Sequence, residues 1–508
     1  MRIGLRLFYN QSWLGGVNYV LNIARMLRAL PPGERPEVIF LTASPEAVEI
    51  ANKNHQLADE IHPFDQAGDL RLDFVFPATQ VSESPFSAPW GGWIPDWQCD
   101  HYPELFSPEE RARRFLQYRT LAEGPAVCIF SSQQAIDDTR RILGHDPGAA
   151  LRMFRFPAVI DREHYRRTPG QLDDTRAKFG IPDRYLIVCN QFWKHKNHLV
   201  VAEALALAAD LDVHVVMTGA LEDERWPDYG AKVKETLAKP AVASRVTQTG
   251  RIDRADQVDL MIGAAGIIQP SLFEGWSTFV EESRALGIPS LLSDIPVHRE
   301  QSPPGCSFFN PLDPSELATR LREFSNRPAT PRDLASIETR HHAYVTACAR
   351  VFMGIAHECA ALFDPAQHES VAILARQLPR IRDEAMTGGG ARPYAKADYD
   401  RFLANIRGML RTSPESLARL AGQLCDEGNP YADEAINSVV LATLAKATSE
   451  ERRRFMEYQP EETASLGIWA AITMAKRAAK QPVTQGRHAV AKALNRARDF
   501  VRRKLPTK

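Results

Sequence analysis

The stretch GIIQPSLFEGWSTFVEESRALGIPSLLS, residues 266–293, contains the pattern on which the fold prediction depends. Its first four residues are a short apolar run, Gly275 marks a turn, and a helical pattern then leads into a second apolar run. In such a strand, turn and helix unit, the backbone N–H groups of the turn and of the helix start lie at the carboxyl end of the strand. We therefore predict a parallel α/β sheet with a phosphate-binding turn here.

Two carboxylates accompany this turn. Glu274 directly precedes Gly275, and Glu282 follows about two helical turns later. Carboxylates at these places can accept hydrogen bonds from sugar or ribose hydroxyl groups. Glu281 is expected to be exposed and only to complement the helix dipole.

The same alternation of strands and helices continues in both directions from this stretch. Before it, apolar runs such as RIGLRLF, EVIFLTA, LDFVFPA and AVCIFSS alternate with helical patterns, and after Pro157 the rhythm restarts with YLIVCNQ and VHVVMTG. Asp313, Pro314 and Glu316 form a helix-start signature, which predicts a helix near 314–325. We predict an α/β fold of two doubly wound, Rossmann-like lobes.

Beyond residue 365 the alternation ends, and apolar residues recur only at helical spacing. The Gly-rich segment 386–393 resembles a flexible joint. We predict an N-terminal lobe over 1–168, a C-terminal lobe with a bracing helix over 169–363, and a helical appendage with a basic tail over 364–508.

The composition limits the class of protein. The 508 residues carry 62 Lys and Arg against 63 Asp and Glu, which argues against a nucleic-acid-binding surface. The 7 cysteines form no C-x-x-C pair, which indicates a reducing compartment. We expect no signal peptide and no transmembrane span, and hence a cytoplasmic protein.

The motif around Glu274 resembles the retaining family 4 glycosyltransferases of the GT-B fold, which have two glutamates separated by seven residues after a Pro-Ser pair. The resemblance implies that Glu274 lies against the donor sugar and acts in catalysis, and that Glu282 holds the ribose hydroxyls. It also implies that the turn covers the donor sugar and phosphates, with donor contacts from Gly275, Trp276, Ser277, Thr278 and Phe279.

A second matching stretch is CNQFWKHKNH, residues 189–198. The family has an arginine and, five residues later, a lysine here, and both neutralise the departing diphosphate. Lys196 matches the lysine and is predicted to act in catalysis, whereas Gln191 occupies the arginine position. Gln191 and Lys194 are predicted donor contacts, and either Lys194 or another basic residue is expected to compensate for the missing arginine.

Three segments of the first lobe are also candidates. Gly15 and Gly16 follow the first strand and resemble the family loop that faces the donor, although they can equally be strand-to-helix punctuation. Asp96 and Asp100 resemble acceptor-side residues, and His101 is either a catalytic residue or a hydrogen-bonded core histidine. Ser131 and Ser132 match a serine loop of the family or serve as a helix N-cap.

The reaction implied is transfer of a sugar from a nucleoside diphosphate to a hydroxyl of a glycan or lipid-linked glycan. No cofactor beyond that co-substrate and no metal ligand is expected, because no Asp-x-Asp pair stands at a strand end and the family needs no metal. Two alternatives stay open: a GT-B epimerase that acts on a nucleotide sugar, and a catalytically silent sugar-nucleotide-binding scaffold.

The C-terminal segment 471–508 contains 11 Lys or Arg and one acid, Asp499. Val490, Leu494, Ala497, Val501 and Leu505 recur at helical spacing, largely apart from the basic residues. Such a helix either lies on an anionic membrane surface, which would place the protein on the inner face of the membrane, or packs on the appendage or a protein partner.

Overall fold

The computed structural model describes residues 1–363 except 10–13, 80–87, 145, 148, 221–225 and 327–331. Between 107 and 126 it describes Glu110, Arg111, Arg114, Tyr118, Leu121 and Ala122. The predicted helical appendage, the joint at 386–393 and the basic tail therefore lie outside the described residues.

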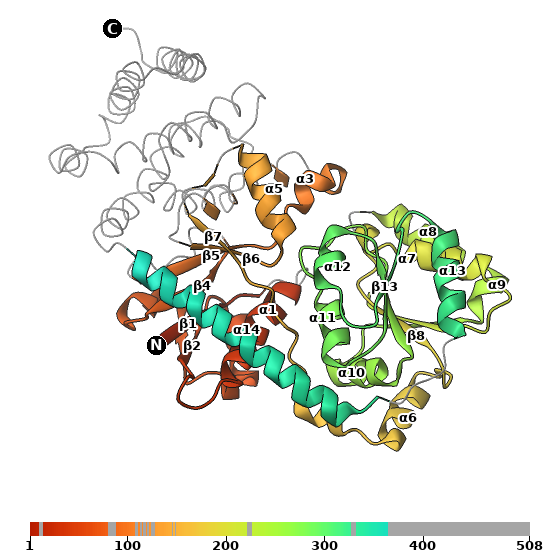
Figure 1. Cartoon of the computed structure of the whole chain (residues 1–508), viewed down its shortest axis with the longest axis horizontal. Coiled ribbons are helices and arrows are strands. Elements are labelled where there is room, and N and C mark those ends of the chain that lie inside the picture. Colours follow the sequence, from red (N-terminus) through yellow and green to blue (C-terminus); the bar gives the residue numbers. More distant parts are fainter. Residues whose placement is uncertain are drawn as a thin grey trace, which may run out of the picture.

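The first lobe is built on a seven-stranded sheet in the order β3-β2-β1-β4-β5-β6-β7, and the pairings between these strands are all parallel (Figure 1). Its strands β1, β2, β4, β5 and β6 are the predicted apolar runs, because strands covered on both faces are apolar throughout. The edge strands β3 and β7 were not predicted, since they are half-exposed and lack such a run. The strands are β1 Arg2–Leu7, β2 Glu37–Thr42, β3 Glu60–Pro63, β4 Phe74–Ala78, β5 Trp90–Ile94, β6 Val127–Phe130 and β7 Ala150–Met153.

Helices pack on this sheet through a continuous apolar core. Tyr19 of α1 stacks on Trp93 of β5 with ring centroids 4.1 Å apart. The α-helices are α1 Leu14–Arg28, α2 Pro45–Lys53, α3 Gln98–His101 and α5 Gln133–Leu143. The 3-10 helices are η1 His55–Leu57, η2 Phe64–Asp69, η4 Pro103–Leu105 and η5 Arg162–Arg166.

The second lobe has a six-stranded parallel sheet in the order β10-β9-β8-β11-β12-β13. The predicted runs again form its centre, while the edges β10 and β13 are half-exposed and escaped prediction. The strands are β8 Leu186–Cys189, β9 Val215–Thr218, β10 Val246–Gly250, β11 Gly266–Gln269, β12 Ser290–Ser293 and β13 Ser307–Phe309. The helices are α6 Pro169–Lys178, η6 Lys194–Lys196, α7 His198–Leu207, α8 Pro227–Leu237, α9 Pro240–Ala243, α10 Arg254–Gly263, α11 Thr278–Ala285, α12 Pro296–Gln301 and α13 Pro314–Ser325.

The helix-start signature at residue 313 is confirmed. Asp313 accepts hydrogen bonds from the N–H groups of Ser315 and Glu316 at 2.9 and 3.2 Å, and α13 begins at Pro314. The Glu316 carboxylate accepts from the N–H of Asn310, at 3.0 Å, in place of the expected N-cap N–H. The helix is thus capped by the aspartate, and the glutamate fixes the loop before it.

The long helix α14 Leu334–Leu362 runs across both lobes (Figure 1). By length and hydropathy it could cross a membrane, which the sequence prediction did not foresee. One side of the helix, including Val345, Ala349 and Phe352, packs in the core of the first lobe, while its earlier turns contact α11. Its apolar composition therefore serves packing between the lobes in this fold.

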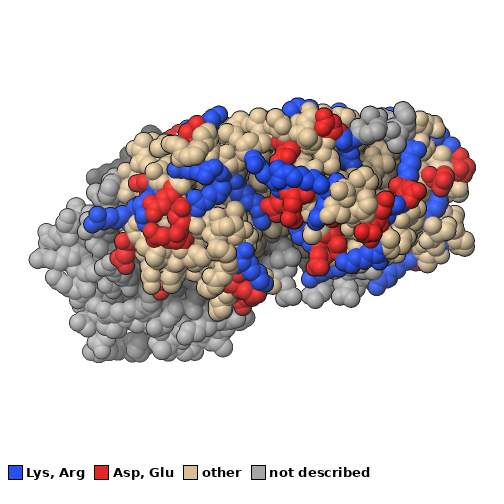
Figure 2. Space-filling model, turned by 90° about the horizontal axis from the view of Figure 1, so that it is seen from below, with Lys and Arg blue, Asp and Glu red and all other residues tan. Residues whose placement is uncertain are grey.

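The surface mixes both signs of charge. On the face in Figure 2, basic and acidic side chains lie interspersed over the described residues. Among the described residues, charged side chains form ion pairs such as Arg322 with Asp210 at 2.6 Å and Arg299 with Asp294 at 2.6 Å. This mixture matches the balanced composition and provides no extended basic stripe on that face.

Loops at the carboxyl ends of both sheets meet between the lobes. The Tyr102 hydroxyl donates to the Leu272 carbonyl at 3.2 Å, and the Trp276 indole donates to the Phe156 carbonyl at 3.0 Å. In the second sheet, β8 and β11 are neighbours although the strands β9 and β10 lie between them in sequence, so this is the topological switch point. Ligands of open α/β sheets bind at such a point.

Candidate functional site

Lys196 and Glu274 meet at the switch point. Lys196 ends the short η6 turn after β8, and Glu274 lies in the loop after β11. The Lys196 ammonium donates to both carboxylate oxygens of Glu274, at 2.7 Å to Oε1 and 2.9 Å to Oε2. Both side chains are largely covered, with 16% and 8% of each exposed. The structure thus brings together two candidate residues that are far apart in the sequence.

A buried polar network holds Glu274 in place. Its Oε1 also accepts from the Gln269 amide at 2.8 Å and from the Ser271 hydroxyl at 2.6 Å. The Gln269 carbonyl in turn accepts from the Asn190 amide at 2.7 Å. Burial opposes ionisation, but the charge of Lys196, together with His298 and the hydrogen bonds from Lys196 and Ser271, outweighs it and holds the pKa of Glu274 below its ordinary value. Glu274 is therefore an ionised, oriented carboxylate.

Gln269 was missed by the sequence prediction. It is fully buried at the end of β11, whose other residues are apolar. A lone amide at the end of an apolar strand, directly before Pro270 and Ser271, was the available signal, because a buried polar side chain needs a partner.

Glu282 lies in α11 and is 94% buried, since 6% of it is exposed. Its Oε1 forms an ion pair of 2.6 Å with Arg254, the first residue of α10. Arg254 was also missed, because nothing in the sequence around α10 indicates that it faces α11. The structure therefore adds a cation to the predicted pair of glutamates.

The turn between Glu274 and α11 is tightly packed. Adding a Cβ to Gly275 would bring it within 2.5 Å of the Pro95 carbonyl oxygen in the opposite lobe, so only glycine fits. The Ser277 hydroxyl caps α11 by accepting from the Val280 N–H at 3.4 Å. The N–H of Ser277 donates to the Gln301 side chain at 3.2 Å, so this amide already has a partner.

The side chains of the turn divide into two groups. Gly275 and Thr278 are partly exposed, as a donor contact requires. Trp276 is buried and donates to the Phe156 carbonyl, and Phe279 is buried in the core of the second lobe. For Trp276 and Phe279, the side chains thus serve packing, and only their backbone can meet the predicted donor.

The expectation that Glu281 is exposed is wrong. Its side chain is fully buried and accepts from the Gln301 amide at 3.0 Å and the Arg284 guanidinium at 3.1 Å. Burial raises the pKa of Glu281, although Arg284 and Gln301 oppose the shift. The reason is that α11 is covered by both α12 and α14, which leaves this face without solvent.

The loop after β8 has partners of its own. Gln191 accepts from the N–H of Ala220 at 3.0 Å, and therefore ties this loop to the one after β9. The Lys194 ammonium lies 3.7 Å from the centre of the Trp226 ring. Gln191 and Lys194 thus stand beside the switch point, each with a contact inside the second lobe.

In the first lobe, Gly15 and Gly16 lie in the first turn of α1, as their strand-to-helix position predicts. Gly15 is exposed and Gly16 buried. Asp96 lies against Gly275 of the other lobe and accepts from the Gln98 N–H at 2.9 Å. Burial raises the pKa of Asp96, while its hydrogen bond and nearby cations oppose the shift.

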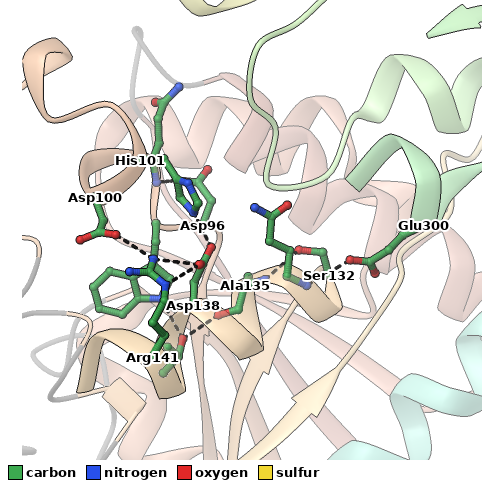
Figure 3. Close-up of polar contacts among 12 residues, drawn as sticks. Asp96, Asp100, His101, Ser132, Ala135, Asp138, Arg141 and Glu300 are labelled. Carbon is green, nitrogen blue, oxygen red and sulfur yellow. Dashed lines mark hydrogen bonds and ion pairs between the residues drawn. The ribbon is translucent and has the colours of Figure 1, made fainter. Parts of the chain in front are cut away.

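His101 is part of a polar chain shown in Figure 3. Its Nε2 lies 2.7 Å from Asp138 of α5, which also accepts from Arg141 at 2.9 Å, and Arg141 pairs with exposed Asp100 at 2.8 Å. Asp138 raises the pKa of His101. The His101 ring packs against Phe273, next to Glu274, with centroids 5.0 Å apart. His101 therefore adjoins the site, whereas Asp100 is engaged in an ion pair outside it.

A second contact between the lobes begins at the start of α5. Ser132 caps this helix by accepting from the Ala135 N–H at 3.3 Å, which confirms the N-cap alternative for this serine. Glu300 of α12 lies beside Ser132 at this helix start (Figure 3). It accepts from the N–H groups of Gln133 and Gln134, at 2.9 and 3.0 Å, and pairs with Arg155 at 3.1 Å. A carboxylate from the second lobe thus binds a helix N-terminus of the first.

The described part of the chain contains no cluster of three His, Cys, Asp or Glu side chains that could hold a metal ion. Its six cysteines, Cys99, Cys128, Cys189, Cys306, Cys348 and Cys359, are all free.

Comparison with known proteins gives a family match for part of the chain and several similar folds. Residues 173–341 match the family model for glycosyl transferases group 1. Of solved structures, HepE (Alr3699) of Anabaena in complex with UDP is similar at 15% identity and a TM-score of 0.53, over 70% of this chain and 98% of that chain. A glycosyltransferase from Rickettsia africae is similar at 16% identity and a TM-score of 0.50, over 70% and 98%. No curated protein matches the sequence.

A third similar structure is the N-terminal domain of a Candida albicans trehalose-6-phosphate phosphatase, at 12% identity and a TM-score of 0.51, over 70% of this chain and 96% of that chain. At these identities the similarity establishes the fold, two Rossmann-like lobes of the GT-B type. Within it, the region that matches the group 1 glycosyltransferase model, residues 173–341, includes Lys196, Glu274 and Glu282.

Proposed function

We propose that the protein is a retaining, metal-independent glycosyltransferase of the family 4 type that uses a nucleoside-diphosphate sugar. The observation that carries this proposal is the ion pair of Lys196 with Glu274 at the switch point, with Glu282 in the next helix. UDP in the complex of HepE, which has the same fold, supports a nucleoside diphosphate as the ligand.

The chemistry separates charge. The bond between the sugar C1 and the diphosphate oxygen breaks, and its electron pair passes to the diphosphate. The acceptor hydroxyl oxygen forms the new bond to C1 on the same face of the sugar, and its proton leaves with the diphosphate. Fixed cations and amide dipoles beside the departing diphosphate are the largest expected contribution to such catalysis.

Lys196 is suited to supply that cation. An ammonium group has three N–H donors, and Glu274 takes two contacts from Lys196. The remaining donor can meet a phosphate oxygen without loss of the ion pair. Because a cation is already fixed by the protein, we propose that no divalent metal is required.

Glu274 is proposed to contact the donor sugar through Oε2, since Oε1 accepts from three donors whereas Oε2 accepts only from Lys196 among the described residues. Asp96 and His101 lie on the opposite lobe beside Gly275 and Phe273. We propose that they face the acceptor, a hydroxyl of a glycan or lipid-linked glycan.

The experiment is thermal unfolding with UDP, GDP, ADP and their sugar conjugates, followed by transfer assays with a labelled sugar. A ligand that binds only the folded protein stabilises it by about 2.7 kcal/mol at a concentration 100 times its Kd. We expect one nucleotide series to stabilise the protein and its sugar label to appear in a glycan or lipid fraction. A label that changes configuration on the nucleotide supports an epimerase, and binding without turnover supports a silent scaffold.

For location, we propose a cytoplasmic protein whose basic tail, residues 471–508, contacts an anionic membrane. Each basic residue near such a surface contributes about 1 kcal/mol. The test is sedimentation of the full chain, and of a version ending at Gln485, with anionic and neutral liposomes at low and high salt. Equal partitioning of the two proteins would contradict membrane contact and favour packing of the tail on protein.

A further inference from the structure

The ion pair of Arg254 with Glu282 has an asymmetric environment. The Glu282 side chain is 8% exposed, whereas half of the Arg254 side chain is exposed, at 50%. Arg254 begins α10, directly after the loop from the edge strand β10, and Glu282 lies within α11. The ion pair therefore joins the start of α10 to α11, at the carboxyl ends of the strands of the second sheet.

The closest contact between Arg254 and Glu282 is to one carboxylate oxygen, Oε1. The Arg254 guanidinium lies 2.6 Å from Oε1 and is the ion-pair partner of this carboxylate among the described residues. A buried carboxylate needs an ionic or hydrogen-bonding partner to remain charged. Arg254 thus meets the requirement at one oxygen and leaves Oε2 able to accept from another group.

Arg254 also lies near charged groups of the first lobe. Burial works against the charged guanidinium, but Glu282 outweighs it and raises the pKa of Arg254. On the first lobe, burial lowers the pKa of Arg25, and the charge of Arg254 lowers it further while Asp161 opposes the shift. Two arginines from the two lobes, Arg25 and Arg254, are therefore near enough to influence one another.

The cation that pairs with Glu282 among the described residues does not come from the basic loop after β8. Gln191 of that loop stands where an arginine was expected, and its carbonyl accepts from the N–H of Ala220. Lys194 packs over Trp226. The cation nearest to the second glutamate is instead Arg254, which comes from a different helix.

We propose that Arg254 is a positioning residue for nucleotide recognition, which holds Glu282 by Oε1 so that Oε2 accepts a ribose hydroxyl. This inference rests on the proposed function, since it assigns the ribose of the donor to Glu282. The contrary arrangement is that Arg254 blocks the carboxylate and must leave before the ribose binds. The two arrangements predict opposite effects on ribose binding when Arg254 is removed. Removal of a positioning residue weakens ribose binding, whereas removal of a blocking residue strengthens it.

The test measures Kd by titration calorimetry for whichever of UDP, GDP and ADP stabilises the wild type, and for its 2′-deoxy and 3′-deoxy counterparts. We expect the wild type to prefer the ribonucleotide to at least one counterpart by about tenfold or more, as for a lost hydrogen bond to a charged group. Arg254→Ala should weaken ribonucleotide binding about tenfold while weakening that deoxynucleotide much less, so that the preference collapses.

Two further variants separate positioning from folding. Arg254→Lys keeps the charge but not the planar guanidinium, and should retain part of the preference. In a Glu282→Gln background, Arg254→Ala should cause little further loss, because the group that it positions has been changed. Arg299→Ala is the matched control, since Arg299 is 56% exposed and also pairs with a carboxylate, Asp294, in the same lobe.

The outcomes are distinct. An unchanged ribose preference in Arg254→Ala, or tighter binding of the ribonucleotide, overturns the inference and leaves the proposed function intact. A wild-type protein that binds none of the three nucleotides or their sugar conjugates overturns both. Loss of binding in Arg299→Ala equal to that in Arg254→Ala would show a general effect of lost ion pairs and would also overturn the inference.

Discussion

Gln269→Leu should destabilise the second lobe and loosen Glu274. The fully buried Gln269 amide donates to Glu274 at 2.8 Å, and its carbonyl accepts from Asn190 at 2.7 Å. A hydrogen bond to a charged group is worth about 1.5 to 3 kcal/mol, and an unpaired buried donor costs about 1 to 3 kcal/mol. With some gain from the apolar leucine, we expect a net loss of about 2 to 4 kcal/mol in the free energy of unfolding.

The pH dependence of stability gives a second readout. The folded state lowers the pKa of Glu274 below its ordinary value of 4.5. The ionised carboxylate therefore contributes stability that is fully present above that value and is lost as the pH falls through the lowered one. Because Gln269→Leu removes one donor, the pKa of Glu274 rises, and the acid loss should begin at a higher pH than in the wild type.

Urea unfolding across the acid range measures both effects. Ser290→Ala is the control, because buried Ser290 has only neutral partners, the Ser283 hydroxyl at 3.0 Å and the Ile288 carbonyl at 3.1 Å. Ser290→Ala should lower the free energy of unfolding by about 1 kcal/mol without changing the pH at which stability is lost in acid. Two results together would refute the argument. Gln269→Leu would have a free energy of unfolding within about 0.5 kcal/mol of the wild type, and it would lose stability in acid at the same pH as the wild type.

Lys196→Ala should slow sugar transfer by about 100-fold or more, and equal transfer rates in wild type and Lys196→Ala would contradict a role for the lysine in the site. Gln191→Arg should be tolerated and should improve binding of the diphosphate. Asp138 raises the pKa of His101 above its ordinary value of 6.5, so the pair contributes stability below that value that is lost as the pH rises through the raised one. Asp138→Asn should therefore flatten the fall of Tm above pH 6.5, and superimposable Tm curves of the two proteins would contradict this. Glu300→Gln should weaken the contact between the lobes by about 1 kcal/mol and increase the radius of gyration in small-angle scattering, where no increase would contradict a closing role for the carboxylate.

The central strands of both sheets could be predicted because they are apolar throughout. Leu186–Cys189 and Gly266–Gln269 are nearly or completely buried, and hydrophobic runs of this kind are visible without knowledge of their neighbours. The edge strand Val246–Gly250, with sequence VTQTG, was missed because it is half-exposed. Its place is set by pairing with β9, which the local sequence does not encode.

Within the site, Glu274 and Glu282 could be found because their spacing lies within one strand, turn and helix unit. Arg254 lies 28 residues before Glu282 in the chain, and only the tertiary fold brings the start of α10 to α11. Glu281 was predicted exposed because a carboxylate in a first helical turn usually is. The covering of α11 by α12 and α14 is a tertiary effect that no local pattern announces.

The measurement that tests the central claim most directly is transfer of a labelled sugar by wild type, Glu274→Ala and Glu282→Ala in excess EDTA, with donor Kd measured alongside. We predict that the wild type stays active in EDTA, that Glu274→Ala loses turnover at nearly unchanged donor affinity, and that Glu282→Ala mainly weakens donor binding, by about tenfold or more. Wild-type turnover and donor affinity in both folded variants would contradict the site assignment. Loss of wild-type activity in EDTA that Mn²⁺ restores would contradict the metal-independent mechanism.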